Sequence, residues 1–205
     1  MSEENQPVGR TKGPGESPHE FTFVSPDSDQ SLRIGEFITY DAEVDGQSRT
    51  IFGRVVERRP LRLFPDAFAS DPSIEPGEVA DLVGYKQADH ELFELSATIL
   101  GYYDERLGDF VNPRIPPREG RAIHLGSDEE LSGVLTERRY GEVGSAHIGS
   151  LLTREAGHVP VVVDLSAIAS THLAVIANTG AGKSYLSSVL VEEMMKPANR
   201  AAILV

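Results

Sequence analysis

One eight-residue segment, residues 177–184, constrains the fold of this chain more than any other feature. It reads Ala-Asn-Thr-Gly-Ala-Gly-Lys-Ser and matches the pattern G-x-x-x-x-G-K-[ST], with Ala177 in place of the leading glycine. The preceding residues, 171–176, form an apolar run typical of a buried parallel strand. The following residues, 182–196, carry apolar side chains at helical spacing. The sequence therefore predicts a strand, a phosphate-binding loop and a helix in direct succession.

The residue types in this loop fit the chemistry of holding a nucleotide. Gly180 and Gly182 allow backbone angles at which successive N–H groups turn inward around a phosphate, next to the N-terminus of a helix. Lys183 is expected to reach the β- and γ-phosphates, and Ser184 to place its hydroxyl on magnesium. Tyr185 could touch the base or ribose, or equally pack on a neighbouring strand. The predicted ATP-binding residues are Asn178, Thr179, Gly180, Ala181, Gly182, Lys183, Ser184 and Tyr185, with Lys183 as the catalytic residue and Ser184 as the Mg²⁺ ligand.

Around the loop the chain is expected to begin an α/β domain. Residues 160–165 form a β-branched strand, and the helix is expected to pack its Leu186, Val189, Leu190 and Met194 face on a sheet before Pro197 ends it. Residues 200–205 begin another strand at which the chain stops. One βαβ unit is too small for a complete NTPase domain, so we expect a truncated one. No residue after Ser184 can be assigned as the acidic residue that organises magnesium. This piece alone is therefore expected to be inactive.

The first part of the chain has the signals of a small closed β-barrel. An Asp45-Gly46 turn joins two strand-like runs, and the capping-box spacing from Ser127 to Glu130 predicts a short helix that closes this domain. A long loop or short helix is expected between residues 61 and 91. The predicted strands cover residues 21–24, 35–40, 50–56, 92–101 and 121–125.

These signals predict four segments. Residues 1–20 are polar and rich in Glu, Pro, Gly and Ser, and are expected to be a disordered tail. Residues 21–136 are expected to form the barrel domain, and residues 137–160 a linker with an entry strand. Residues 161–205 are expected to begin the P-loop ATPase domain.

Composition and charge bear on the cellular location of the protein and on its binding partners. The net charge is -13, and fifteen of the nineteen basic residues are arginines, a pattern that resembles a halophile proteome. Such acidity argues against strong non-specific duplex binding, so a DNA contact must come from a local patch or from other residues. The clusters Arg58, Arg59, Arg62 and Arg138, Arg139 are interpreted as solvated positions rather than DNA contacts. No secretory signal or membrane-spanning run is visible and Cys is absent, so we expect a cytoplasmic protein without thiol chemistry.

Several segments together resemble the archaeal HerA family of ATPases. The stretch His-Ile-Gly-Ser-Leu at 147–151, the strand at 160–165 and His-Leu-Ala-Val-Ile at 172–176 running into the phosphate loop occur in the family's order. Residues 35–56 and 97–131 are similar to its N-terminal barrel, the HAS-barrel. Ala177 and Ala181 depart from the more frequent Gly and Ser. The resemblance implies a HAS-barrel-like domain followed by the first βαβ part of a RecA-like P-loop NTPase domain.

The resemblance also implies a function. HerA proteins are homo-hexameric ATPases, helicases that translocate on double-stranded DNA and act with a NurA-type nuclease in end resection during repair. Their barrel is expected to help ring assembly and nuclease docking. Two alternatives stay open at this point: a HerA-like ATPase of phage defence or conjugation, and a ring-assembly or partner-binding module that holds nucleotide as a structural ligand.

Overall fold

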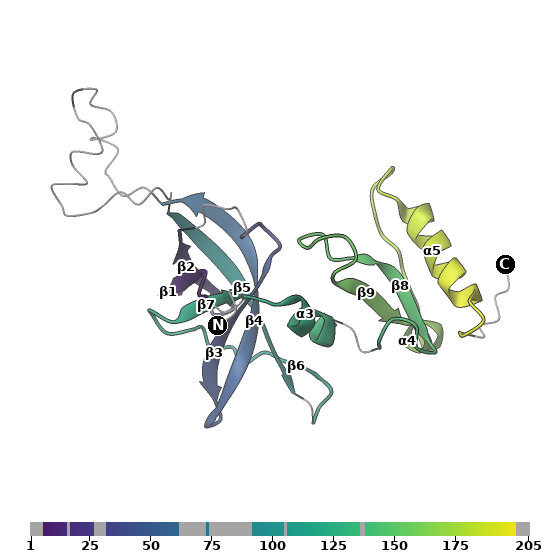
Figure 1. Ribbon diagram of the computed structural model, residues 1–205, viewed down its shortest axis with the longest axis horizontal. Coiled ribbons are helices and arrows are strands. Elements are labelled where there is room, and N and C mark those ends of the chain that lie inside the picture. The colour runs from purple at the N-terminus through teal and green to yellow at the C-terminus, as the bar shows by residue number, and fades with distance from the viewer. Residues whose placement is uncertain are drawn as a thin grey trace. The chain divides into compact units, whose positions relative to one another are not determined.

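The protein is described by a computed structural model covering residues 6–15, 17–26, 32–61, 73, 92–104, 106–135 and 138–199. The chain divides into two compact units, residues 1–126 and residues 127–205 (Figure 1). The first is a β-barrel and the second a small sheet with helices, as the sequence predicts for a barrel followed by the start of an α/β domain. The predicted insertion at 61–91 and the predicted strand at 200–205 lie outside the described residues.

The first unit is a closed antiparallel barrel. Its strand order is β2-β1-β7-β3-β4-β5, and pairing of β2 with β5 closes the ring, while β6 extends β5 as a short hairpin. Closure leaves the barrel strands without a free edge. The strands are β1 Gly9–Pro14, β2 Glu20–Ser25, β3 Phe37–Val44, β4 Gln47–Pro60, β5 Phe93–Asp104, β6 Asp109–Val111 and β7 Ala122–Leu125.

Local sequence signals account for much of this unit. The β3–β4 hairpin turns at Asp45 and Gly46, with φ values of 52° and 76°, the positive angles that a two-residue hairpin turn requires. Burial alternates along β2, which places Phe21 and Phe23 in the core. Where β6 leaves β5, Gly101 has φ 130° and approaches the backbone of Val111 so closely that a Cβ would lie 2.4 Å from its carbonyl oxygen.

The prediction of a disordered tail over residues 1–20 is wrong for β1. Gly9 to Pro14 pair with β2 on one side and β7 on the other, and Gly9, Thr11 and Gly13 face the interior. A Cβ on Gly9 would lie 2.5 Å from the Val24 carbonyl oxygen, so a small residue is needed there. β1 is held by backbone hydrogen bonds rather than by apolar side chains. Its composition therefore resembles that of a disordered segment.

A buried hydroxyl in the barrel core yields a stability prediction. Tyr40 is 1% exposed, and its Oη has no hydrogen-bond partner among the described residues. Burial raises the pKa of this hydroxyl well above its usual range. Because an unpaired buried polar group is costly, Tyr40→Phe should raise the free energy of unfolding by about 1–2 kcal/mol in chemical denaturation. Phenylalanine keeps the edge-on ring contact with Phe21 at 5.2 Å.

The matched control for Tyr40→Phe is Tyr103→Phe. Tyr103 is 41% exposed, so water can hydrate its hydroxyl in the native protein. Removing that hydroxyl should leave the free energy of unfolding unchanged within about 0.5 kcal/mol. A Tyr40→Phe protein that is less stable than wild type would refute the prediction, because it would mean that the hydroxyl makes a favourable bond.

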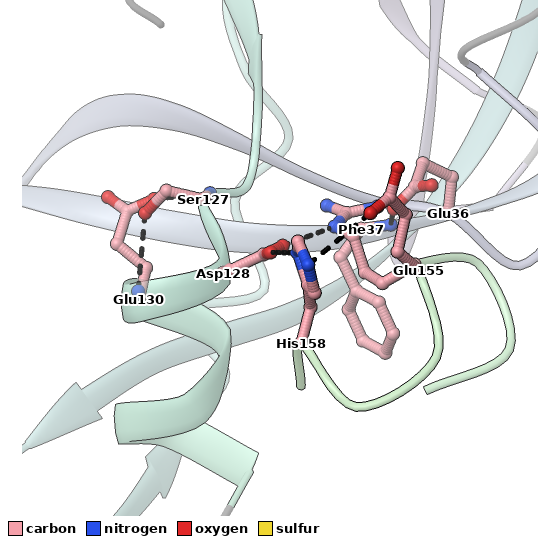
Figure 2. A network of polar contacts seen from close by, with 8 residues as sticks. Glu36, Phe37, Ser127, Asp128, Glu130, Glu155 and His158 are labelled. Carbon is pink, nitrogen blue, oxygen red and sulfur yellow. Dashed lines mark hydrogen bonds and ion pairs between the residues drawn. The ribbon is translucent and has the colours of Figure 1, made fainter. Parts of the chain in front are cut away.

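The second unit begins with a capped helix. In α3, Asp128–Leu135, the Ser127 N–H donates to Glu130 Oε2 (2.9 Å) and the Glu130 N–H donates to Ser127 Oγ (3.2 Å), which confirms the predicted capping box (Figure 2). The helix contacts β9 and belongs to this unit, whereas the sequence suggested that it closes the barrel. The division after Gly126 thus falls ten residues before the predicted boundary at 136.

A polar network ties the start of α3 to a loop of the same unit. Asp128 Oδ2 lies 3.1 Å from His158 Nδ1, and Asp128 Oδ1 accepts a hydrogen bond from Arg154 Nε at 2.9 Å. The other ring nitrogen of His158 lies 3.3 Å from Glu155 Oε2 (Figure 2). His158 and Glu155 are exposed, so this network orients the loop more than it stabilises the fold.

The remaining elements form a small sheet flanked by helices. Strands β8, Ser145–Ser150, and β9, Pro160–Asp164, pair antiparallel, and α5, Lys183–Met195, packs on β8 (Figure 1). The short helix α4, Leu165–Ser170, follows β9 directly. The strand predicted at 160–165 and the helix predicted at 182–196 are both confirmed. None of the described helices combines the length and apolar character that crossing a bilayer requires.

The predicted strand at 171–176 does not form. These residues have no ladder partner in the described part of the chain, and Leu173 and Ile176 are 53% and 92% exposed. His172, expected to be satisfied within that strand, is exposed as well. A parallel strand needs a neighbour to bond with, and neither described strand of this unit pairs with these residues.

Candidate nucleotide-binding site

The predicted phosphate loop forms a tight turn into α5. Gly180 and Gly182 have φ values of 82° and 86°, and the Ala181 N–H donates to the Asn178 carbonyl at 3.2 Å. A Cβ at either glycine would meet nothing within 4 Å, so the positive φ, not space, is what requires glycine at both positions. Both glycines thus adopt the backbone angles that the phosphate-loop pattern predicts.

The N-terminus of α5 is open to an anion. Gly182 is its N-cap residue and no side chain caps the helix, while the Leu186 N–H makes the first intrahelical bond, to the Gly182 carbonyl. The N–H groups of the first turn therefore lack the acceptor that a capping side chain would provide. Uncapped N–H groups and the helix dipole both favour a phosphate at this end.

Lys183 folds back over its own loop. Its Nζ donates to the carbonyl oxygens of Ala177 (2.5 Å) and Asn178 (3.3 Å), and its side chain is exposed. These two bonds hold the Lys183 ammonium group against the backbone of the phosphate loop. An ammonium group has three N–H donors, so one donor remains for a phosphate oxygen.

The other predicted residues surround this turn. Ser184 is exposed at the first turn of α5, and no described residue bonds its hydroxyl, while its carbonyl accepts from Ser188 Oγ at 3.0 Å. Tyr185 is 77% exposed, so it does not pack against a strand in the described structure. Asn178 and Thr179 form the exposed outer side of the loop. The loop thus brings all eight predicted residues together.

The far end of α5 is anchored to β8 by a residue that the sequence did not indicate. The Asn199 side chain accepts from the Gly144 N–H (2.7 Å) and donates to the carbonyls of Ser145 (3.1 Å) and Glu193 (2.8 Å). Its partners lie up to 55 residues away, so no local pattern could have identified it. The predicted apolar face of α5 also packs inward, with Leu190 buried and Leu186, Val189 and Met194 half-buried.

Two ion pairs help to hold the second unit together. Arg138 Nε lies 2.9 Å from Asp164 Oδ2, and this contact with the guanidinium lowers the pKa of the Asp164 carboxyl. Asp164 also caps α4 by accepting from the Ser166 N–H. The contact between Lys196 and Glu193, 2.6 Å long, raises the pKa of the lysine ammonium. Arg138 is therefore a structural residue of this unit rather than a solvated position.

An apolar cavity of about 280 Å³ lies beside α5. Its wall includes Leu173, Val175 and Ile176 of the extended segment, together with Leu186 and Leu190 of the helix. The apolar residues of the predicted strand thus line a hollow of this unit, even though they make no strand pairing.

Comparisons with known proteins find similarity over this part of the chain. Residues 146–205 match the family model of the helicase HerA central domain. A probable helicase of Methanocaldococcus jannaschii is 42% identical over 84 residues, 41% of this chain and 15% of the relative. DNA double-strand break repair helicases HerA from Sulfolobus acidocaldarius and Pyrococcus furiosus are 36% and 33% identical, over 43% and 57% of this chain.

These relatives are much longer than the matched segments, which span 15 to 20% of their length. The match to the family model begins at β8 and includes β9, α4, the phosphate loop and α5. Two of these relatives are named DNA double-strand break repair helicases, and the third is named a probable helicase. Residues 146–205 therefore match the central domain of the HerA helicases, and the chain is similar to archaeal HerA-type helicases over part of their length.

Proposed function

We propose that the protein carrying this chain is an ATP-driven, homo-hexameric translocase and helicase on double-stranded DNA that acts with a NurA-type nuclease in end resection. The observation that carries this proposal is the open phosphate loop, with positive φ at Gly180 and Gly182, within a segment that matches the HerA central domain. Relatives named for double-strand break repair favour repair over phage defence or conjugation.

The described residues fit Mg²⁺ and ATP. Lys183 already offers its ammonium across the loop, and Ser184 has an unengaged hydroxyl one residue further on. In the proposed complex, Lys183 binds the β- and γ-phosphates, Ser184 is a magnesium ligand, and the N–H groups of the loop surround the β-phosphate. Asn178, Thr179 and Tyr185 line the site, with Tyr185 free to contact the base or ribose. Bound ATP supplies the phosphoryl group whose transfer to water drives the motor.

In this proposal the two units have separate roles. The unit with the phosphate loop binds nucleotide, and the barrel assists ring assembly and docks the nuclease. The closed barrel suits such a role because it is held by its own core, with Phe21, Tyr40 and Ile123 buried.

The decisive experiment measures ATP turnover by the full-length protein with and without linear duplex DNA. A translocase should hydrolyse ATP several-fold faster when duplex is present, and the protein should have the mass of a hexamer in solution. Closed circular duplex of equal length shows whether ends matter for resection with the nuclease. ATP binding without any DNA-stimulated turnover would contradict the proposal and favour a module that holds nucleotide as a structural ligand.

A further inference from the structure

An exposed turn on the barrel gathers arginine side chains. Residues 118–121 form a β-turn in which the Arg121 N–H donates to the Arg118 carbonyl at 3.4 Å, and Gly120 has φ 74°, as the third residue of a type II turn requires. The ends of such a turn lie within about 7 Å of each other. Arg118 and Arg121, both exposed, are therefore neighbours.

Strand β1 adds a third arginine to this turn. Arg10 Nη1 donates to the Gly120 carbonyl at 3.0 Å, so its guanidinium lies against the turn itself. Thr11 fixes the arrangement: its Oγ1 donates to the Arg118 carbonyl (2.5 Å) and accepts from the Arg121 N–H (2.9 Å). We call Arg10, Arg118 and Arg121 the arginine turn. Backbone bonds of Thr11 to Gly120 and Arg121 complete its frame.

The arginine turn carries uncompensated charge. Among the described residues, none of its three guanidinium groups forms an ion pair, and Glu119 offsets only one positive charge. Four other described arginines, Arg59, Arg106, Arg138 and Arg154, pair with Glu57, Asp104, Asp164 and Asp128. In a chain of net charge -13, this concentration of free positive charge is a local exception.

We propose that the arginine turn binds the phosphate backbone of duplex DNA, which rests on the proposed function. Guanidinium groups bind phosphate oxygens bidentately, and three of them held on one turn can engage neighbouring phosphates without reading sequence. Because the rest of the chain is acidic, the arginine turn would also orient the duplex by attraction at one place and repulsion elsewhere. The barrel thereby contacts DNA in addition to any contact made by the motor unit.

The test measures the salt dependence of DNA binding. Each neutralised phosphate contributes about 0.9 to the slope of log K against log salt concentration. The full-length Arg10→Gln/Arg118→Gln/Arg121→Gln protein should have a slope smaller by about 2 to 3 than wild type, on duplexes of unrelated sequence alike. The Arg10→Lys/Arg118→Lys/Arg121→Lys protein keeps the charge and should retain most of the wild-type slope. Circular dichroism confirms that each variant is folded.

A matched control removes the same charge elsewhere on the barrel. Arg49→Gln/Arg59→Gln/Arg106→Gln eliminates three arginines that contact Gln47, Glu57 and Asp104, and should leave the slope within about 0.5 of wild type. Equal slopes for the arginine-turn variant and wild type overturn the inference. A variant whose slope is unchanged but whose oligomeric mass falls also overturns it, in favour of an acidic protein surface as the partner. Failure of wild type to bind duplex at all would instead refute the proposed function.

Discussion

Replacing Lys183 with alanine should abolish DNA-stimulated ATP turnover by the full-length protein and weaken ATP binding by about 10- to 100-fold. The binding loss follows from the removal of charge-assisted hydrogen bonds, worth about 1.5–3 kcal/mol, since each 1.4 kcal/mol is tenfold in affinity. Turnover should fall further, by about 100-fold or more, because phosphoryl transfer depends on cationic groups aimed at the developing charge. Isothermal titration with ATP and a phosphate-release assay measure the two effects.

Lys196→Ala is the matched control for Lys183→Ala. Lys196 follows the other end of α5 and pairs with Glu193, and its substitution removes one positive charge, as Lys183→Ala does. Its loss should leave ATP affinity within about twofold of wild type, because the site lies a helix length away. Lys183→Ala also removes the bonds to the carbonyls of Ala177 and Asn178, so the helix content of both variants should be compared. Wild-type turnover in the Lys183→Ala protein would exclude the proposed role of this residue.

The parts of the fold that the sequence predicted are those decided by short-range chemistry. The Asp45-Gly46 turn and the Ser127–Glu130 capping box were predictable because their hydrogen-bonding and conformational demands lie within a few residues. The order of the barrel strands was not, because β1 and β7 meet across more than 100 residues of sequence. Gly9 and Thr11 of β1 carry no hydropathy signal. They are buried because β1 pairs within the closed barrel.

The candidate site shows the same contrast between short-range and long-range interactions. The phosphate loop was predictable because glycine conformation, a helix N-terminus and a lysine follow one another directly in the sequence. Asn199 was not predictable, because its partners at Gly144 and Ser145 approach it only in the folded unit. The apolar pattern of residues 171–176 predicted a buried strand that does not form, because an apolar run in the sequence does not by itself provide a neighbouring strand to pair with.

Phe21→Ala should lower the free energy of unfolding of the barrel by about 3–5 kcal/mol. The Phe21 side chain is fully buried, its ring lies 5.2 Å from that of Tyr40 and 6.1 Å from that of Phe23, and its strand pairs with β1 and β5 to close the ring. A loss of that size is a large fraction of the 5–15 kcal/mol typical of a domain. Because the chain has no tryptophan, far-ultraviolet circular dichroism in a urea titration is the suitable measurement.

The control for Phe21→Ala is Leu107→Ala, at a residue that is 70% exposed in the turn before β6 and should change stability by less than about 0.5 kcal/mol. The second unit has its own sheet and helices, so ATP affinity should be lowered in neither variant under conditions in which the protein stays folded. Phe21→Leu should recover part of the loss, since it keeps most of the apolar volume. A Phe21→Ala protein with wild-type stability would mean that the barrel is not held by the core around β2.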